Sequence, residues 1–249
     1  MPSPPTRLTT TYTTIEWSAD GLEVTKQRLP RHDAARRHRY ELRVNQLLGR
    51  RPPPVPIARL VAHHRGGLRF EAIRGAPLGP KYPDSLDTSQ IDAMIDLAHA
   101  LRGYRPQARW MRSFRSDRRI ELARRLGFLT ATQSDALQHV AAQVHTHRRF
   151  AHGDLTARNV LATEPGDLVL IDWEWAGLYP PEYDLAFLWF SLVDVPNARD
   201  RVESRVSSLE RLLLSALLIQ LWHLQWYAPL AFRERHLGTR DELVARLLS

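Results

Sequence analysis

The chain has 249 residues, which is long enough to bury a sizeable core as one large domain or two joined lobes. It contains no cysteine, so disulfides and thiolate chemistry are excluded, and this composition is compatible with a reducing cytoplasm. The net charge of +8 would suit a nucleic-acid-binding protein. However, the 35 basic residues, all arginine except Lys26 and Lys81, are spread over the whole length, so we do not expect a nucleic-acid partner.

Neither a secretion signal nor a membrane span is predicted. The N-terminal stretch MPSPPTRLTTTYTT lacks the apolar core of a signal peptide, and we expect a cytoplasmic location. The most apolar stretch, residues 212–232, contains Gln220, His223 and Pro229, which a bilayer-spanning helix tolerates poorly. We therefore predict a buried core helix there and no membrane association.

The first elements along the chain are a β-hairpin and a helix. Residues 9–29 are rich in β-branched and aromatic residues on both sides of an Asp-Gly turn, a pattern that predicts a hairpin. Residues 32–49 have helical composition, with Asp33 as a predicted N-cap and Gly49 as a predicted stop.

Two further strands follow a proline-rich bend. They are predicted at 59–64 and 68–73, on either side of a Gly-Gly turn. The order strand, strand, helix, strand, strand predicts a small α+β N-terminal lobe over residues 1–73. We expect a connector at 74–80 and a mostly helical C-terminal lobe at 81–249.

The C-terminal part has a helical pattern interrupted by two short apolar strands. The strands are predicted at 159–163 and 168–172, around a Pro-Gly turn. Helices are predicted at 88–103, 116–127, 131–147, 182–193, 199–227 and 239–248.

Three polar residues stand at the ends of these apolar strands, in the segment FAHGDLTARNVLATEPGDLVLIDWEWAG (150–177). Pairing of the two strands would bring Asn159 and Asp172 together, with Asp154 on the loop that leads in. Oxygen ligands of this kind suit Mg²⁺, which takes one or two protein oxygens and completes its shell with water and phosphate. A separate upstream carboxylate suits a base that receives the proton of an attacking hydroxyl.

The strings HGDLTARNVL, LIDWEWAG and YDLAFLW resemble the aminoglycoside phosphotransferase and choline kinase-like family of small-molecule kinases, which has the protein-kinase-like fold. The resemblance implies that Asp154 is the catalytic base and that Asn159 and Asp172 bind magnesium. It also implies transfer of the γ-phosphate of ATP or GTP to a hydroxyl of a small molecule.

Three further residues of this segment receive supporting roles. Glu174 matches an acidic position of the family and could assist a second metal or its waters. Asp184 matches a buried aspartate that hydrogen-bonds the backbone of the catalytic loop. We expect His152 to pack in that loop and to bond backbone rather than to ligate a metal.

The resemblance extends to the N-terminal lobe. It implies that Lys26, on the second strand of the hairpin, contacts the nucleotide phosphates and that Glu41 on the helix orients it. In the hinge-like stretch LRFEAIRGAPLG, backbone groups of Glu71 and Ile73 would bond the adenine edge, with Phe70 at the back of the pocket.

One departure concerns the turn that covers the phosphates, which in this family is rich in glycine or other small residues. The corresponding stretch here, LTTTYTT (8–14), has no glycine. An alternative is therefore a catalytically inactive kinase-like module that binds nucleotide or a partner; a third reading, supported only by charge, is a basic nucleic-acid-binding protein.

The acceptor is the least determined part of the prediction. Aminoglycosides are polycations that favour acidic clefts, and an arginine-rich chain argues mildly against them. A neutral or anionic hydroxylated metabolite, or a sugar- or nucleoside-containing antibiotic, is an equally good expectation, and an antibiotic acceptor would imply a role in antibiotic resistance.

Overall fold

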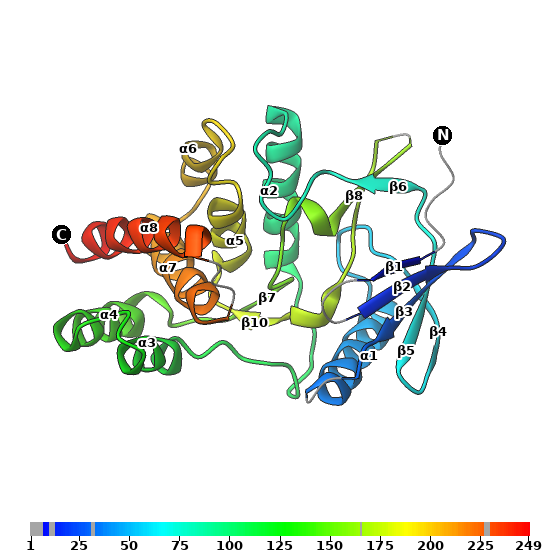
Figure 1. Cartoon of the computed structure of the whole chain (residues 1–249), viewed down its shortest axis with the longest axis horizontal. Coiled ribbons are helices and arrows are strands. Elements are labelled where there is room, and N and C mark those ends of the chain that lie inside the picture. Colours follow the sequence, from blue (N-terminus) through cyan, green and yellow to red (C-terminus); the bar gives the residue numbers. More distant parts are fainter. Residues whose placement is uncertain (1–6, 10–12, 31–32, 165, 227–229) are drawn as a thin grey trace.

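The N-terminal part of the chain forms a five-stranded antiparallel sheet, seen at one end of the computed structural model (Figure 1). The structure describes residues 7–9, 13–30, 33–164, 166–226 and 230–249. The strand order is β1-β2-β3-β5-β4, with β1 at Arg7–Thr9, β2 at Thr13–Trp17, β3 at Glu23–Arg28, β4 at Leu60–His64 and β5 at Gly67–Glu71. The predicted hairpin is therefore confirmed as β2 and β3, and both later strands are confirmed as well.

A single long helix, α1 (Ala34–Arg50), accompanies this sheet. Its buried residues recur at positions 34, 41, 44, 45 and 48, the spacing of one helical face. The prediction that the Asp33 side chain caps the helix is wrong. Asp33 occupies the N-cap position, but its Oδ2 pairs with Arg37 Nε, one turn later, at 2.5 Å. Gly49 does not stop the helix either, since α1 continues to Arg50.

A second, three-stranded antiparallel sheet joins the connector to the segment that carries the candidate site. Its order is β6-β8-β9, with β6 at Gly75–Pro77, β8 at Val160–Thr163 and β9 at Leu168–Leu170. The strands predicted at 159–163 and 168–172 are thus present, and β9 ends two residues before Asp172. Strand β6 lies inside the stretch predicted as a connector, and its residue Ala76 pairs with Ala162.

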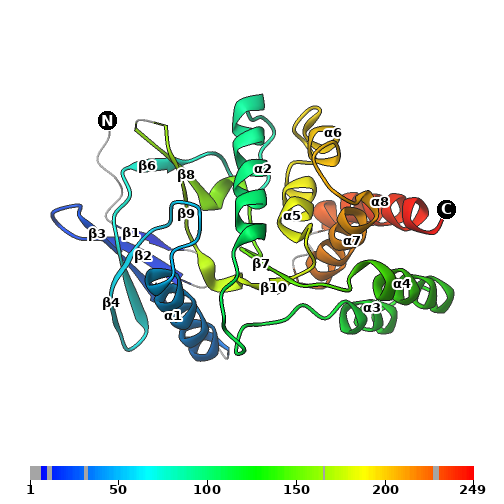
Figure 2. The ribbon, with the colours of Figure 1, turned by 180° about the vertical axis from the view of Figure 1, so that it is seen from behind.

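The remaining elements are mostly helical and lie at the opposite end of the molecule from the five-stranded sheet (Figure 2). Two paired strands, β7 (Arg149–Ala151) and β10 (Gly177–Tyr179), flank the segment 152–176, which carries Asp154, Asn159 and Asp172. The helices are α2 (Thr88–Gly103), α3 (Ser116–Arg125), α4 (Ala131–Val144), α5 (Tyr183–Ser191), α6 (Ala198–Glu203), α7 (Leu209–Trp226) and α8 (Leu230–Leu248).

The single helix predicted over 199–227 is wrong, because the chain breaks between α6 and α7. The serines at the break explain it, since serine side chains compete for backbone partners and favour caps. The hydroxyl of Ser207 donates to Glu182 at 2.5 Å, and that of Ser208 accepts from the backbone N–H of Arg211 at 3.3 Å. At the C-terminus, α8 begins at Leu230 rather than at the predicted 239.

Helices α5 and α7 form the centre of the C-terminal core. All nine residues of α5 are buried, and the apolar residues of α7 from Leu212 to Leu221 are at most 3% exposed. The apolar stretch that includes α7 is therefore a core helix, as predicted. Among the helices of the described residues, none is both long and apolar enough to cross a membrane.

Candidate active site

Lys26 joins the two halves of the molecule through two ion pairs. Its Nζ lies 2.8 Å from Glu41 Oε1 on α1 and 2.8 Å from Asp172 Oδ1, which follows β9. Residues separated by 146 positions in the chain therefore meet at one ammonium group. The structure brings together three of the predicted site residues.

The charges at this centre perturb one another strongly. Burial by itself would lower the pKa of Lys26, but the carboxylates of Asp172 and Glu41 outweigh it and hold the pKa above its ordinary value. Burial raises the pKa of Glu41 to about 7 against the opposing charge of Lys26, while Asp172 adds to the rise. Two carboxylates thus compete for one ammonium, and Lys26 stays protonated.

The backbone at Asp172 has the left-handed conformation that turns its carboxylate toward Lys26. Its φ and ψ are both 65°, values that a non-glycine residue adopts at a cost of about 1 kcal/mol. Its side chain is 30% exposed, whereas that of Glu41 is 6% exposed. Asp172 is therefore the more exposed of the two carboxylates, although Glu41 also lines the pocket beside Lys26.

Asp184 holds the backbone of His152 and Gly153, just before Asp154, in place. Its two carboxylate oxygens accept the backbone N–H groups of His152 at 2.8 Å and Gly153 at 2.9 Å. This matches the supporting role predicted for Asp184. Gly153 has φ +82°, and a Cβ there would lie 2.3 Å from the carbonyl oxygen of Trp175, so the loop requires glycine.

His152 bonds backbone, as predicted. Its Nε2 lies 2.9 Å from the Ile171 carbonyl oxygen, and the Asp154 N–H approaches its Nδ1 at 3.4 Å. A carbonyl can only accept and an N–H can only donate, so the proton resides on Nε2. His152 thereby links the catalytic loop to the residue before Asp172.

The carboxylate of Asp154 is surrounded by donors. Asn159 Nδ2 donates to its backbone carbonyl at 2.8 Å and to its Oδ2 at 3.0 Å. Lys81 Nζ lies 3.1 Å from its Oδ1, and Arg158 Nη2 lies 3.9 Å from its Oδ2. The predicted base and the first predicted metal ligand are therefore neighbours, and a lysine not assigned from the sequence joins them.

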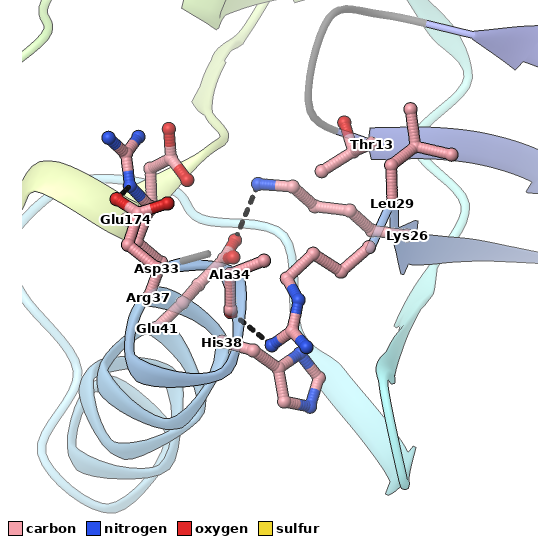
Figure 3. A pocket seen from close by; sticks show the side chains of 10 residues that line it. Thr13, Lys26, Leu29, Asp33, Ala34, Arg37, His38, Glu41 and Glu174 are labelled. Atoms are coloured by element: carbon pink, nitrogen blue, oxygen red, sulfur yellow. Dashed lines mark hydrogen bonds and ion pairs between the residues drawn. The ribbon is translucent and has the colours of Figure 1, made fainter. Parts of the chain in front are cut away.

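A pocket lies between β2, β3 and the start of α1, and Thr13, Lys26, Glu41 and Glu174 are among the residues that line it. Figure 3 shows Lys26 reaching from β3 toward Glu41, with Glu174 close to the N-terminal end of α1. Burial raises the pKa of Glu174, opposed by Lys26 and reinforced by Asp172. The stretch 8–14, where a phosphate-covering turn was expected, includes residues 10–12, which lie outside the described residues.

The hinge residues lie where the sheet meets the connector. Phe70 pairs with Val24 and Leu68 pairs with Lys26 across β3 and β5, so Phe70 and Lys26 share one face of the sheet. The N–H of Glu71 donates to the Arg59 carbonyl, which leaves its carbonyl as the backbone group that could meet a nucleotide.

The donor set at Asn159 and Asp172 fits a hard divalent cation. Asn159 uses its amide nitrogen toward Asp154, so its amide oxygen is the atom left for a metal. Within the described residues, no three His, Asp or Glu side chains form a metal cage of their own. A site of two protein oxygens is the arrangement Mg²⁺ adopts when phosphates and water supply the other ligands.

Sequence reasoning missed a set of contacts, here called the Tyr40 clamp, that holds α1 against Ala176 and Arg112. The Tyr40 hydroxyl donates to the Ala176 carbonyl at 2.6 Å and accepts from the Arg112 N–H at 3.1 Å. The Arg112 guanidinium stacks over the Tyr40 ring at 4.1 Å. No sequence signal marks this clamp. A signal did exist for Lys81, because it is the second of the two lysines in the chain and is as unusual as Lys26.

Comparison with known proteins places this chain in a family. The model described as "Phosphotransferase enzyme family" matches residues 17–214. Among solved structures, the chain is similar to the aminoglycoside phosphotransferase APH(4)-Ia, with a TM-score of 0.71, 17% identity and coverage of 96% of this chain and 92% of that one. No curated protein sequence matches the chain.

Two other solved structures share the fold. The choline kinase LicA from Streptococcus pneumoniae has a TM-score of 0.66 at 16% identity, covering 96% of this chain and 94% of that one. The macrolide 2'-phosphotransferase MphH from Brachybacterium faecium has a TM-score of 0.64 at 14% identity, covering 94% and 90%. These likenesses establish the protein-kinase-like fold, and the family match over residues 17–214 shows that the chain belongs to the phosphotransferase enzyme family.

Proposed function

We propose that the protein transfers the γ-phosphate of ATP or GTP, with Mg²⁺, to a hydroxyl group of a small molecule. The acceptor would be a hydroxylated metabolite or an antibiotic. The observation that carries the proposal is the connected set of contacts around Asp172. Lys26 lies 2.8 Å from both Glu41 and Asp172, and Ile171, the residue before Asp172, bonds the carbonyl of Asn159, whose side chain bonds Asp154 at 3.0 Å. A cation for phosphates, oxygen ligands for a metal and a carboxylate base are the parts that phosphoryl transfer requires.

Asp154 would act as the base. The acceptor oxygen attacks the γ-phosphorus and forms a new O–P bond, while the bond from the γ-phosphorus to the bridging oxygen breaks and releases the nucleoside diphosphate. The hydroxyl proton passes to the Asp154 carboxylate, whose position is held by the Asn159 amide. Positioning and electrostatics provide most of the rate enhancement in this chemistry.

The other predicted residues would bind the nucleotide. Lys26 would hold the phosphates, with Glu41 keeping its ammonium in place. Asn159 and Asp172 would hold Mg²⁺, which neutralises phosphate charge when bound. For the base of the nucleotide, the carbonyl of Glu71 and the N–H of Ile73 would bond the adenine edge, with Phe70 behind it.

The experiment that tests this proposal measures phosphoryl transfer directly. The protein is incubated with ATP or GTP, Mg²⁺ and a panel of hydroxylated metabolites and antibiotics, and products are detected by the mass of one added phosphoryl group. Asp154→Asn should abolish the product without abolishing nucleotide binding. Asp167→Asn, the same substitution at an exposed turn, should leave it intact.

An inactive nucleotide-binding module would behave differently. It would bind Mg²⁺ and nucleotide but give no phosphorylated product with any member of the panel. Product formation by Asp154→Asn at the wild-type rate would show that Asp154 is not the base.

A further inference from the structure

Resting on the proposed function, we infer that the acceptor is an anionic hydroxylated small molecule and that Lys81 selects it. Lys81 belongs to the loop between β6 and α2, which crosses from the connector to the helical lobe (Figure 1). Its Nζ lies 3.1 Å from Asp154 Oδ1, so an ammonium stands against the carboxylate proposed to receive the acceptor's proton.

The ammonium is held in place by aromatic rings as well as by the carboxylate. Lys81 Nζ lies 5.4 Å from the centre of the Phe187 ring on α5 and 6.0 Å from that of Tyr82. Aromatic faces attract cations at this range. The Lys81 side chain is 22% exposed, so its charge is partly shielded from water but remains accessible at the surface.

A second cation flanks the base. Arg158 Nη2 lies 3.9 Å from Asp154 Oδ2, on the other carboxylate oxygen. Two positive side chains therefore contact the carboxylate at which the acceptor hydroxyl must arrive. Because Lys81 Nζ lies 3.1 Å from Asp154 Oδ1, an acceptor whose hydroxyl reaches Asp154 can place a neighbouring substituent beside Lys81.

The helices behind Lys81 supply little negative charge. Asp184 is the one acidic residue of α5, and both of its oxygens are bonded to the catalytic-loop backbone. Glu210, in the first turn, is the one acidic residue of α7. The α7 residue near Phe187 is instead His223, whose ring centre lies 5.8 Å from the Phe187 ring centre.

These features favour an acceptor with a carboxylate or phosphate beside its hydroxyl. Lys81 Nζ lies against Asp154 Oδ1, so an anionic substituent beside the acceptor hydroxyl would approach the same positive charge. A cationic substituent at the same position would meet the Lys81 charge at a few ångströms in a partly desolvated site. The expected penalty for that cation is about tenfold or more in kcat/KM.

The test uses three acceptors that share one carbon skeleton and differ in charge. Glycerate is the anionic, glycerol the neutral and 3-amino-1,2-propanediol the cationic probe, with kanamycin as a polycation. Product formation with Mg²⁺ and nucleotide is followed by mass spectrometry for the wild type, Lys81→Met and Lys81→Arg. A charge-matched control is Arg125→Met, which removes a positive charge from an exposed position on α3.

We expect the wild-type kcat/KM to fall in the order glycerate, glycerol, amine. Lys81→Met should reduce the preference for glycerate over the amine by about tenfold or more, whereas Lys81→Arg and Arg125→Met should keep it. The wild-type order tests the inference even if Lys81→Met fails to fold.

The outcomes separate this inference from the proposed function. Faster phosphorylation of the amine or kanamycin than of glycerate, equal rates for all probes, or an unchanged preference in folded Lys81→Met would overturn the inference while leaving the phosphotransferase activity established. No product from these probes would overturn the inference as well. The proposed function would fail only if the wider panel of metabolites and antibiotics also gave no product.

Discussion

Replacing Tyr40 by phenylalanine tests how the N-terminal helix is kept in register with the catalytic segment. The substitution removes only the hydroxyl that donates to the Ala176 carbonyl at 2.6 Å and accepts from the Arg112 N–H at 3.1 Å. Each bond contributes about 1 kcal/mol net, and Ala176 is fully buried, so we expect a loss of about 2 kcal/mol in the free energy of unfolding.

The same substitution should also lower the activity, because Tyr40 is adjacent to Glu41. A helix that is free to shift would no longer hold the Glu41 carboxylate 2.8 Å from Lys26 Nζ. A displacement of this kind should reduce kcat by about tenfold, equivalent to about 1.4 kcal/mol in the activation free energy. Stability is measured by urea unfolding and activity by phosphorylated product at saturating nucleotide.

Tyr104→Phe is the matched control. The Tyr104 hydroxyl donates to the carbonyl of Arg51, just beyond the other end of α1 and ten residues from Glu41. Its removal should lower the stability without lowering kcat. If Tyr40→Phe lost stability but kept the wild-type kcat, the proposed link between the clamp and the Lys26–Glu41 pair would be refuted.

Three further substitutions have defined outcomes. Gly153→Ala should lower the unfolding free energy by more than about 2 kcal/mol and abolish activity, because its Cβ would meet the Trp175 carbonyl. The control is Gly127→Ala, where φ is also positive but the space is open, and thermal melts should show a smaller loss of stability for it. Burial lowers the pKa of His145 from 6.5 to about 4, so between these pH values the unfolded chain binds a proton that the folded chain does not. The free energy of unfolding should therefore be highest above pH 6.5 and fall by about 3 kcal/mol toward pH 4; His145→Gln should show a shallower pH dependence in urea unfolding, and an unchanged slope would contradict this assignment. Lys26→Arg should lower kcat by about a hundredfold in the product assay, because a forked guanidinium cannot replace one nitrogen shared by two carboxylates at 2.8 Å. Near-wild-type activity would show that the shared nitrogen of Lys26 is not required.

Much of the candidate site could be predicted because its residues are close in sequence. Asp154, Asn159 and Asp172 fall within one hairpin-like segment, and strand pairing alone brings their ends together. The role of Asp184 came from a resemblance to a family, and the two backbone N–H bonds of its carboxylate agree with it. The elements were predictable for a similar reason, since helical and strand periodicities are local patterns.

Helix boundaries were predicted less well where side chains took unexpected partners. Asp33 pairs with Arg37 instead of capping α1, and the serines after α6 end a helix that the apolar pattern would have continued. In each case a local preference lost to a side-chain bond whose geometry only the folded chain defines.

By itself, the sequence determined which chemistry the chain can carry: a scarce lysine on a strand, and two aspartates and an asparagine at the ends of short apolar strands. Only the tertiary structure decided which charges share a site. Lys26 reaches Asp172 across 146 residues, Lys81 reaches Asp154 across 73, and Tyr40 reaches Ala176 across 136. Periodicity encodes the face on which a residue lies, but contacts between distant segments depend on how the lobes pack. The positive charge beside Asp154 arises from that packing.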